Sequence, residues 1–139
     1  MDYVLGYCVG NDVSSRYWQM PERAGQAGYA KGFDKFAPIG PILVSPETLP
    51  DIGTLNLVTK VNEEVRQTTK LDDLIFDIPT LVRHLSRGMT LRRFSVILTG
   101  TPSGVGALMK PPSWIKDGDV VTIEIDKLGR ISNRMKFIS

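Results

Sequence analysis

The chain has 139 residues, of which 42% are hydrophobic and 23% charged, with 17 basic and 15 acidic side chains. This length and balance predict one globular domain with a single core. The near-neutral charge argues against a nucleic-acid partner. No apolar run approaches the roughly 20 residues of a membrane-spanning helix, so we expect no membrane partner. The single cysteine, Cys8, excludes an internal disulfide and favours a reducing intracellular compartment.

A strand is predicted at the start of the chain. Residues 3–10 are apolar and contain glycine, which is typical of a mostly buried strand. We expect no signal peptide, because the start lacks a basic leader and carries the acidic Asp2. Because this strand follows Met1 and Asp2 at once, we also expect the chain to begin within a domain. Residues 19–41 are rich in Gly, Pro and Ala and predict a long ordered loop.

A β-hairpin is predicted near the middle of the chain. Apolar and polar side chains alternate from residue 54 to 61, and Asn62-Glu63 offers a turn before a second arm at 64–69. Alternation of this kind indicates a sheet with one face on the core.

One helix is predicted, over residues 77–87. Asp77 is suited to the N-cap and Gly88 to the C′ position, while Pro79 is tolerated in the first turn. The apolar side chains that follow the i, i+3, i+4, i+7 spacing are Ile78, Leu81, Val82 and Leu85. We expect this apolar stripe to pack against the sheet.

The last third of the chain predicts more β-structure. Residues 95–100 form a short apolar strand, and residues 119–137 form a closing hairpin that turns near Leu128-Gly129. The side chains expected on one face of its second arm are Ile131, Met135 and Phe137. The fold class is therefore α+β, mainly β, with one principal helix and a single domain over 1–139.

Few polar positions stand out by residue type alone. Asp12, directly after a strand, fits a turn or a helix N-cap as well as a site. Lys31 fits a solvated lysine, although its small and aromatic neighbours could draw it toward a pocket. The glycine-rich residues 99–106 read as a turn or an anion cradle. We assign no role to His84, the only histidine, which lies in the predicted helix.

Four segments in this order resemble the C-terminal catalytic region of the fumarylacetoacetate hydrolase family. They are GYCVGNDVSSRYWQ, AKGFDKFAPIGP, KVNEEVRQ and ILTGTPSGVG, and the resemblance runs from Tyr3 to Phe137. It implies that residues 1–139 are one portion of a catalytic domain. It further implies a β-roll, or a mixed barrel-like sheet, and a homodimer.

The resemblance also implies the site. Asp12 matches a ligand of a catalytic Mg²⁺, Mn²⁺ or Ca²⁺. Arg16 and Gln19 match residues that line the substrate pocket, Lys31 matches a catalytic lysine that hydrogen-bonds a substrate oxygen, and Thr101 matches a catalytic threonine that contacts the substrate carboxylate or carbonyl. Family substrates are small β-diketo or 2-oxo acids, whose paired oxygens suit a hard cation. Positive charge stabilises the enolate that forms when a C–C bond breaks.

The family's other metal carboxylates, a Glu-x-Glu, and its catalytic histidine precede the segment that matches Asp12. This chain starts only eleven residues before Asp12, so we expect neither group and only weak metal binding. Two functions stay open. One is a metal-dependent hydrolase or decarboxylase of C–C bonds, cytoplasmic or mitochondrial. The other is a truncated, non-catalytic module that acts as a structural or oligomerisation partner.

Overall fold

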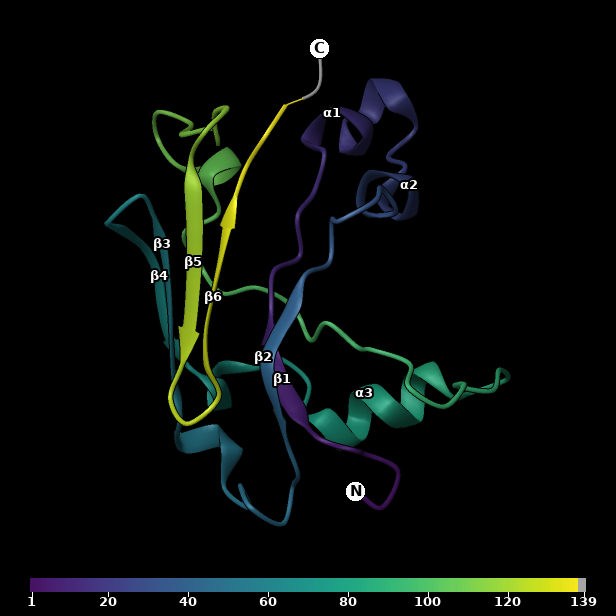
Figure 1. Cartoon of the computed structure of the whole chain (residues 1–139). Helices are drawn as coiled ribbons and strands as arrows, with labels where there is room; N and C mark the ends of the chain where they lie inside the picture. The colour runs from purple at the N-terminus through teal and green to yellow at the C-terminus, as the bar shows by residue number, and fades with distance from the viewer. Residues whose placement is uncertain (138–139) are drawn as a thin grey trace.

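The computed structural model describes residues 1–137 and contains two antiparallel sheets (Figure 1). The larger sheet has the strand order β4-β3-β5-β6. Its strands are β3 (Asn56–Val61), β4 (Glu64–Lys70), β5 (Val120–Ile125) and β6 (Gly129–Arg134). The smaller sheet pairs β1 (Tyr7–Gly10) with β2 (Ile39–Val44). Both predicted hairpins are therefore confirmed, and their turns lie where the sequence placed them.

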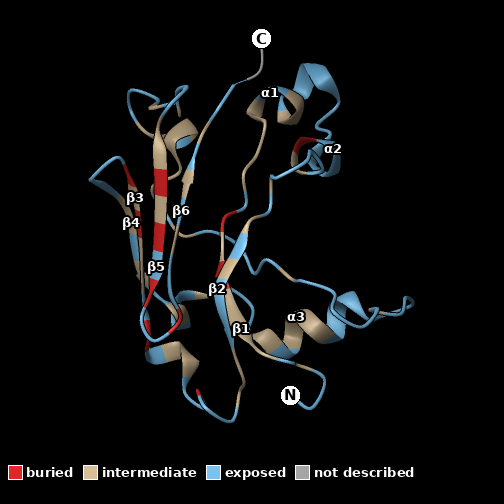
Figure 2. Cartoon of the chain, viewed as in Figure 1, coloured by how far each residue is buried: buried red, intermediate tan, exposed pale blue. Residues whose placement is uncertain are grey.

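The core lies on one face of the larger sheet. Leu57 of β3 stands opposite Ile125 of β5, and Val61 stands opposite Val121, so the apolar side chains of the two strands share that face. Figure 2 shows buried residues along β3, β5 and the β5–β6 turn, and others at β1 and on α2. The buried core cluster comprises Val9, Leu49, Leu55, Val61, Val121, Ile123, Ile125 and Leu128. Each side chain fully buried in such a cluster contributes roughly 1.5–3 kcal/mol.

The smaller sheet covers this core. Val9 of β1 is fully buried in it, and β1 and β2 lie against β5 and β6. Within residues 1–137, the strand pairings form two separate sheets and do not close a barrel. The expected α+β, mainly β class is confirmed, whereas the barrel-like closure is not seen. Residues 95–100, predicted as a strand, belong to neither sheet. The backbone of these residues joins no strand ladder in the described part of the chain, although the Leu98 side chain lies against Gly10 of β1.

Short helices occupy residues 16–31, and so replace the first part of the long loop that the sequence predicted over residues 19–41. They are α1 (Arg16–Gln19), the 3-10 turn η1 (Pro21–Arg23) and α2 (Ala27–Lys31), and β2 then begins at Ile39. Glycines and prolines hide these elements from propensity arguments, because the elements are held by tertiary contacts rather than by periodicity. Three further 3-10 turns occur: η2 (Ile52–Thr54), η3 (Leu71–Asp73) and η4 (Gly106–Leu108).

The predicted helix is α3 (Ile78–Leu85). Its N-cap is Asp77, as predicted, and the Asp77 Oδ1 accepts a hydrogen bond from the Thr80 N–H at 2.8 Å. Gly88 has a φ of +84° but lies beyond the Ser86 C-cap, one position later than expected for C′. None of the residues of α3 is buried, so its packing against the sheet is not confirmed.

The face predicted for the second arm of the closing hairpin is only partly correct. Ile131 and Met135 pack against the core cluster. Phe137 lies beyond the end of β6 and is 61% exposed. Its N–H donates to the Asp117 Oδ1 at 2.8 Å, which holds it to the loop before β5 rather than to the core.

The chain exposes much surface for its mass. Its accessible surface is 10288 Å², whereas a compact monomer of 15.4 kDa exposes about 7,200 Å². The exposed apolar side chains around α3 include Ile75, Phe76, Leu85 and Met89. No helix among the described residues is both long enough and apolar enough to cross a membrane.

Candidate active site

Backbone pairing continues past the ends of β1 and β2 and brings two distant segments together. The N–H groups of Asn11, Val13 and Ser15 donate to the carbonyls of residues 38, 36 and 30 at 3.0, 3.0 and 2.9 Å. Asn11 is buried, and its Nδ2 donates to the Asn133 Oδ1 of β6 at 3.1 Å. The residues after β1 are therefore held in register with α2, which carries Lys31.

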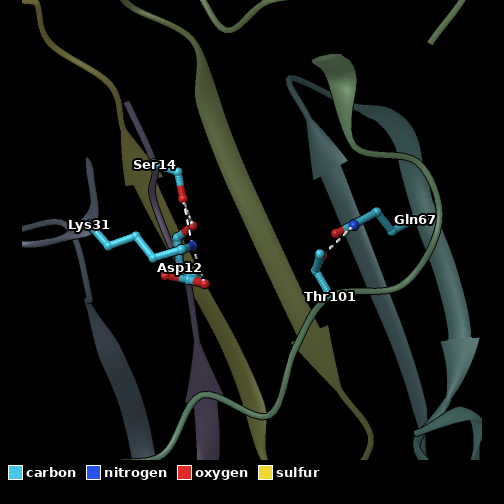
Figure 3. A network of polar contacts seen from close by, with 5 residues as sticks. All are labelled: Asp12, Ser14, Lys31, Gln67 and Thr101. Carbon is cyan, nitrogen blue, oxygen red and sulfur yellow. Dashed lines mark hydrogen bonds and ion pairs between the residues drawn. The ribbon is translucent and has the colours of Figure 1, made fainter. Parts of the chain in front are cut away.

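Asp12, Ser14 and Lys31 form the polar cluster at this place (Figure 3). The Lys31 Nζ donates to the Asp12 Oδ2 at 2.6 Å and to the Ser14 Oγ at 2.7 Å. The Ser14 Oγ in turn donates to the Asp12 carbonyl at 3.2 Å. An ammonium has three donors, of which two are engaged here, and no acceptor within residues 1–137 meets the third. The Lys31 and Asp12 side chains are 39% and 33% exposed, which leaves the cluster open to solvent.

A row of aromatic rings braces α1 against α2. Successive ring centroids lie 5.1, 5.0, 5.1 and 5.2 Å apart, mostly edge to face. The rings belong to Tyr17, Trp18, Tyr29, Phe33 and Phe36. Edge-to-face pairs at this spacing are attractive beyond the area they bury. The row therefore fixes the segment that ends in Lys31.

Arg16 and Gln19 open and close the four-residue helix α1, directly after the cluster. The Gln19 Oε1 is buried, and it has no hydrogen-bond partner within the described part of the chain. A buried amide oxygen without a partner costs free energy. Both residues follow Asp12 within seven positions of the sequence. Within residues 1–137, however, no hydrogen bond joins either of them to Asp12, Ser14 or Lys31.

Thr101 lies in the loop after residue 100, and its partner is Gln67 of β4. The Gln67 Nε2 donates to the Thr101 Oγ1 at 2.8 Å and to the Pro102 carbonyl at 3.1 Å. Figure 3 shows this pair apart from the Asp12 cluster. The structure therefore joins Asp12 to Lys31 and places Thr101 in a separate contact.

Two polar partners had no role assigned from the sequence. Ser14 follows Asp12 by two positions, and its bond to Lys31 becomes visible only once α2 is placed. Gln67 ends the segment KVNEEVRQ, which carries part of the family resemblance and lies in a predicted hairpin arm, but no role was assigned to this glutamine. The alternation of β4 gave no sign that its side chain faces the loop at 101–102.

The residues present do not by themselves fit a resident metal ion. Within residues 1–137, no three His, Cys, Asp or Glu side chains are grouped so as to hold one. Asp12 is a single carboxylate, and its Oδ2 is bonded to Lys31. A hard dication takes several oxygen ligands, so the carboxylates of this cluster are too few.

Comparison with known proteins identifies the fold and the family. The family model described as "Fumarylacetoacetate (FAA) hydrolase C-terminal" matches residues 1–136. The mitochondrial oxaloacetate tautomerase fahd2 of Xenopus laevis is 44% identical over 96% of this chain, which covers 42% of that protein.

Two solved structures show the same fold. The fumarylacetoacetate hydrolase of Exiguobacterium antarcticum has a TM-score of 0.91 and 38% identity, over 99% of this chain and 48% of that one. The maleylpyruvate hydrolase of Sphingobium sp. SYK-6, in complex with manganese(II) and pyruvate, has a TM-score of 0.80 and 33% identity, over 97% of this chain and 45% of that one. The chain thus spans about half the length of the relatives it matches, and it belongs to the fumarylacetoacetate hydrolase family.

Proposed function

We propose that this chain supplies the substrate-binding side of an enzyme site for small 2-oxo or β-diketo acids, at which an enolate forms. The observation that carries the proposal is the geometry of Lys31. Its ammonium is held by Asp12 and Ser14 at the end of β1, and its third N–H donates to no group in the described part of the chain. The names of the relatives mention oxaloacetate and maleylpyruvate, and one of the solved structures contains pyruvate. All three molecules carry a carboxylate next to a keto carbonyl.

Each site residue then has a chemical role. Lys31 donates to the substrate oxygen that gains negative charge as the enolate forms. Arg16 binds the substrate carboxylate with two parallel hydrogen bonds. Gln19 and Thr101 complete the pocket with neutral hydrogen-bonding groups. Asp12 orients Lys31 and offers one carboxylate oxygen toward Mg²⁺, Mn²⁺ or Ca²⁺, which is too few ligands for tight binding.

The reaction is hydrolysis or decarboxylation at a C–C bond, and both proceed through an enolate. Tautomerisation, the reaction named for the Xenopus relative, needs the same enolate but no activated water. Hydrolysis needs a general base that takes a proton from the attacking water. Loss of such a base lowers the rate about 10²–10⁴-fold. We therefore expect the 139-residue chain alone to hydrolyse acetylpyruvate barely above background.

The test compares this chain with a chimera. In the chimera, the part of the Xenopus tautomerase that has no counterpart here precedes residues 1–139. Acetylpyruvate and oxaloacetate absorbance are followed with added Mg²⁺. We expect the chimera to turn over substrate and to lose that activity on Asp12→Ala. Robust hydrolysis by the chain alone would refute the assignment of roles, and a folded but inactive chimera would favour the second function below.

A second function, a non-catalytic partner in an assembly, is favoured by the exposed surface. The excess over a compact monomer is about 3,000 Å² for one chain, which exceeds the roughly 1,000–2,500 Å² that each partner contributes to an obligate interface. The family resemblance implies a homodimer, and the apolar side chains around α3 give such an association a surface to bury. Light scattering after size exclusion tests this. A monomer at all concentrations would exclude self-association, whereas a dimer that survives dilution would support it.

A further inference from the structure

The side chain of Gln67 has a fixed orientation in the structure. Its Nε2 contacts the Pro102 carbonyl oxygen at 3.1 Å. A carbonyl oxygen only accepts hydrogen bonds, so the amide nitrogen, and not the amide oxygen, must face it. The oxygen and nitrogen of a side-chain amide are often hard to tell apart, but a carbonyl partner decides which of the two faces it.

The same nitrogen fixes the polarity of Thr101. An amide nitrogen has two N–H donors. One meets Pro102, and the other meets the Thr101 Oγ1 at 2.8 Å. A hydroxyl that accepts on one side keeps its own hydrogen for a different acceptor. Because Thr101 is exposed, that hydrogen is available to a ligand.

The backbone around this contact is closely fitted. Gly104 has a φ of +102°, and a Cβ at this position would overlap the Arg66 carbonyl oxygen and lie 3.1 Å from the Gln67 Cγ. No side chain fits in that space, so the loop crosses β4 directly at Gln67. The loop backbone therefore packs closely against β4 beside Gln67.

We infer that Gln67 is a positioning residue that commits the Thr101 hydroxyl to donate a hydrogen bond. Thr101 then offers its hydrogen to ligand groups that accept, which are carboxylate, carbonyl and enolate oxygens. This rests on the proposed function only in that Thr101 touches the substrate. The role of Gln67 itself concerns the loop and holds without any substrate.

The test reverses the polarity at residue 67 without changing its shape. In Gln67→Glu, a carboxylate replaces the amide and accepts the Thr101 hydrogen, so the hydroxyl no longer donates outward. Oxalate is the probe, since it offers only acceptor oxygens. We expect Gln67→Glu and Thr101→Val each to weaken oxalate binding about tenfold, in line with a hydrogen bond to a charged group. Thr101→Ser, which keeps the hydroxyl, should bind nearly as the parent chain does.

The double variant separates this effect from added charge. If Gln67→Glu acts through Thr101, adding it to Thr101→Val should cost little more, because the donor is already lost. A full second loss in the double variant would mean that the new charge repels oxalate directly, and it would overturn the inference. So would a Gln67→Glu variant that binds oxalate as the parent does.

A measurement on the free chain keeps the inference testable if oxalate does not bind. Failure of the parent chain to bind oxalate counts against the proposed function. In ¹H–¹⁵N spectra, the two Gln67 side-chain amide protons should be distinct, and Thr101→Val should shift one of them strongly while leaving the other near its position. If Thr101→Val changes the chemical shift of neither Gln67 amide proton, the role inferred for Gln67 is wrong. Gln26, whose Nε2 donates to the Arg23 carbonyl, is the internal reference.

Discussion

Replacing Lys31 with methionine should separate function from stability. The change removes the ammonium that bonds Asp12 and Ser14 at 2.6 and 2.7 Å but keeps the length of the side chain. Asp12 and Lys31 are 33% and 39% exposed, so water screens their attraction and solvates the partner left behind. We therefore expect the free energy of unfolding to change by only about 0–1 kcal/mol.

The same change should strongly weaken binding of a small oxo acid. A hydrogen bond from a charged donor to a ligand oxygen contributes about 1.5–3 kcal/mol, which is roughly a 10- to 100-fold loss of pyruvate or oxalate affinity. Lys35→Met is the matched control, because Lys35 is an exposed lysine of the same segment. Urea denaturation followed by circular dichroism measures stability, and calorimetric titration measures affinity. A loss of stability above about 2 kcal/mol, or unchanged affinity in Lys31→Met, would refute the reasoning.

Three further outcomes are expected. Calorimetric titration with Mg²⁺ or Mn²⁺ should show weak binding that Asp12→Ala removes, because Asp12 is one carboxylate; tight one-to-one binding that persists in Asp12→Ala would reveal another ligand set. Asp119 has a pKa lowered by the Asn62 side-chain amide and then by the Lys116 N–H. Its stabilisation is therefore present above the ordinary value of 3.8 and is lost as the pH falls through the lowered value. Acid unfolding curves of Asp119→Asn should show a weaker decline below about pH 4, and an unchanged curve would contradict this. Leu128→Ala, at a residue only 1% exposed, should cost about 2–5 kcal/mol in urea denaturation, whereas a cost below about 1 kcal/mol would show that the core closes around the gap.

Local patterns predicted the elements that local contacts determine. The hairpin at 56–70 and the N-cap Asp77 of α3 follow from alternation and capping, which involve neighbours in the sequence. The strand predicted at 95–100 failed because an apolar run becomes a strand only when a ladder partner lies beside it. β2 was missed because its Gly40 and Pro41 conceal its periodicity.

The site shows the same limit more clearly. Neither Asp12 nor Lys31 could be singled out by residue type, and it was the family resemblance that joined them. Their contact at 2.6 Å depends on pairing between residues 11–15 and 30–38, which no periodicity reports. The contact of Gln67 with the Thr101 loop could not be predicted from the sequence for a different reason. Its role depends on the path of a loop whose own sequence, rich in Gly and Ser, is compatible with many conformations.

The strand order β4-β3-β5-β6 determines where this fold can tolerate change in length. β3 pairs with β4 through a tight turn, but it also pairs with β5, so the segment from 71 to 119 is one large loop closed by the β3–β5 ladder. The entropy of closing a flexible loop rises only with the logarithm of its length, about 0.6 kcal/mol for each doubling. α3 and the Thr101 loop both lie in that segment. A residue inserted or deleted at the exposed residues 86–90, away from the Gln67 contact, leaves the pairing of the larger sheet intact, so the length of this segment can vary between related proteins at little cost to the core.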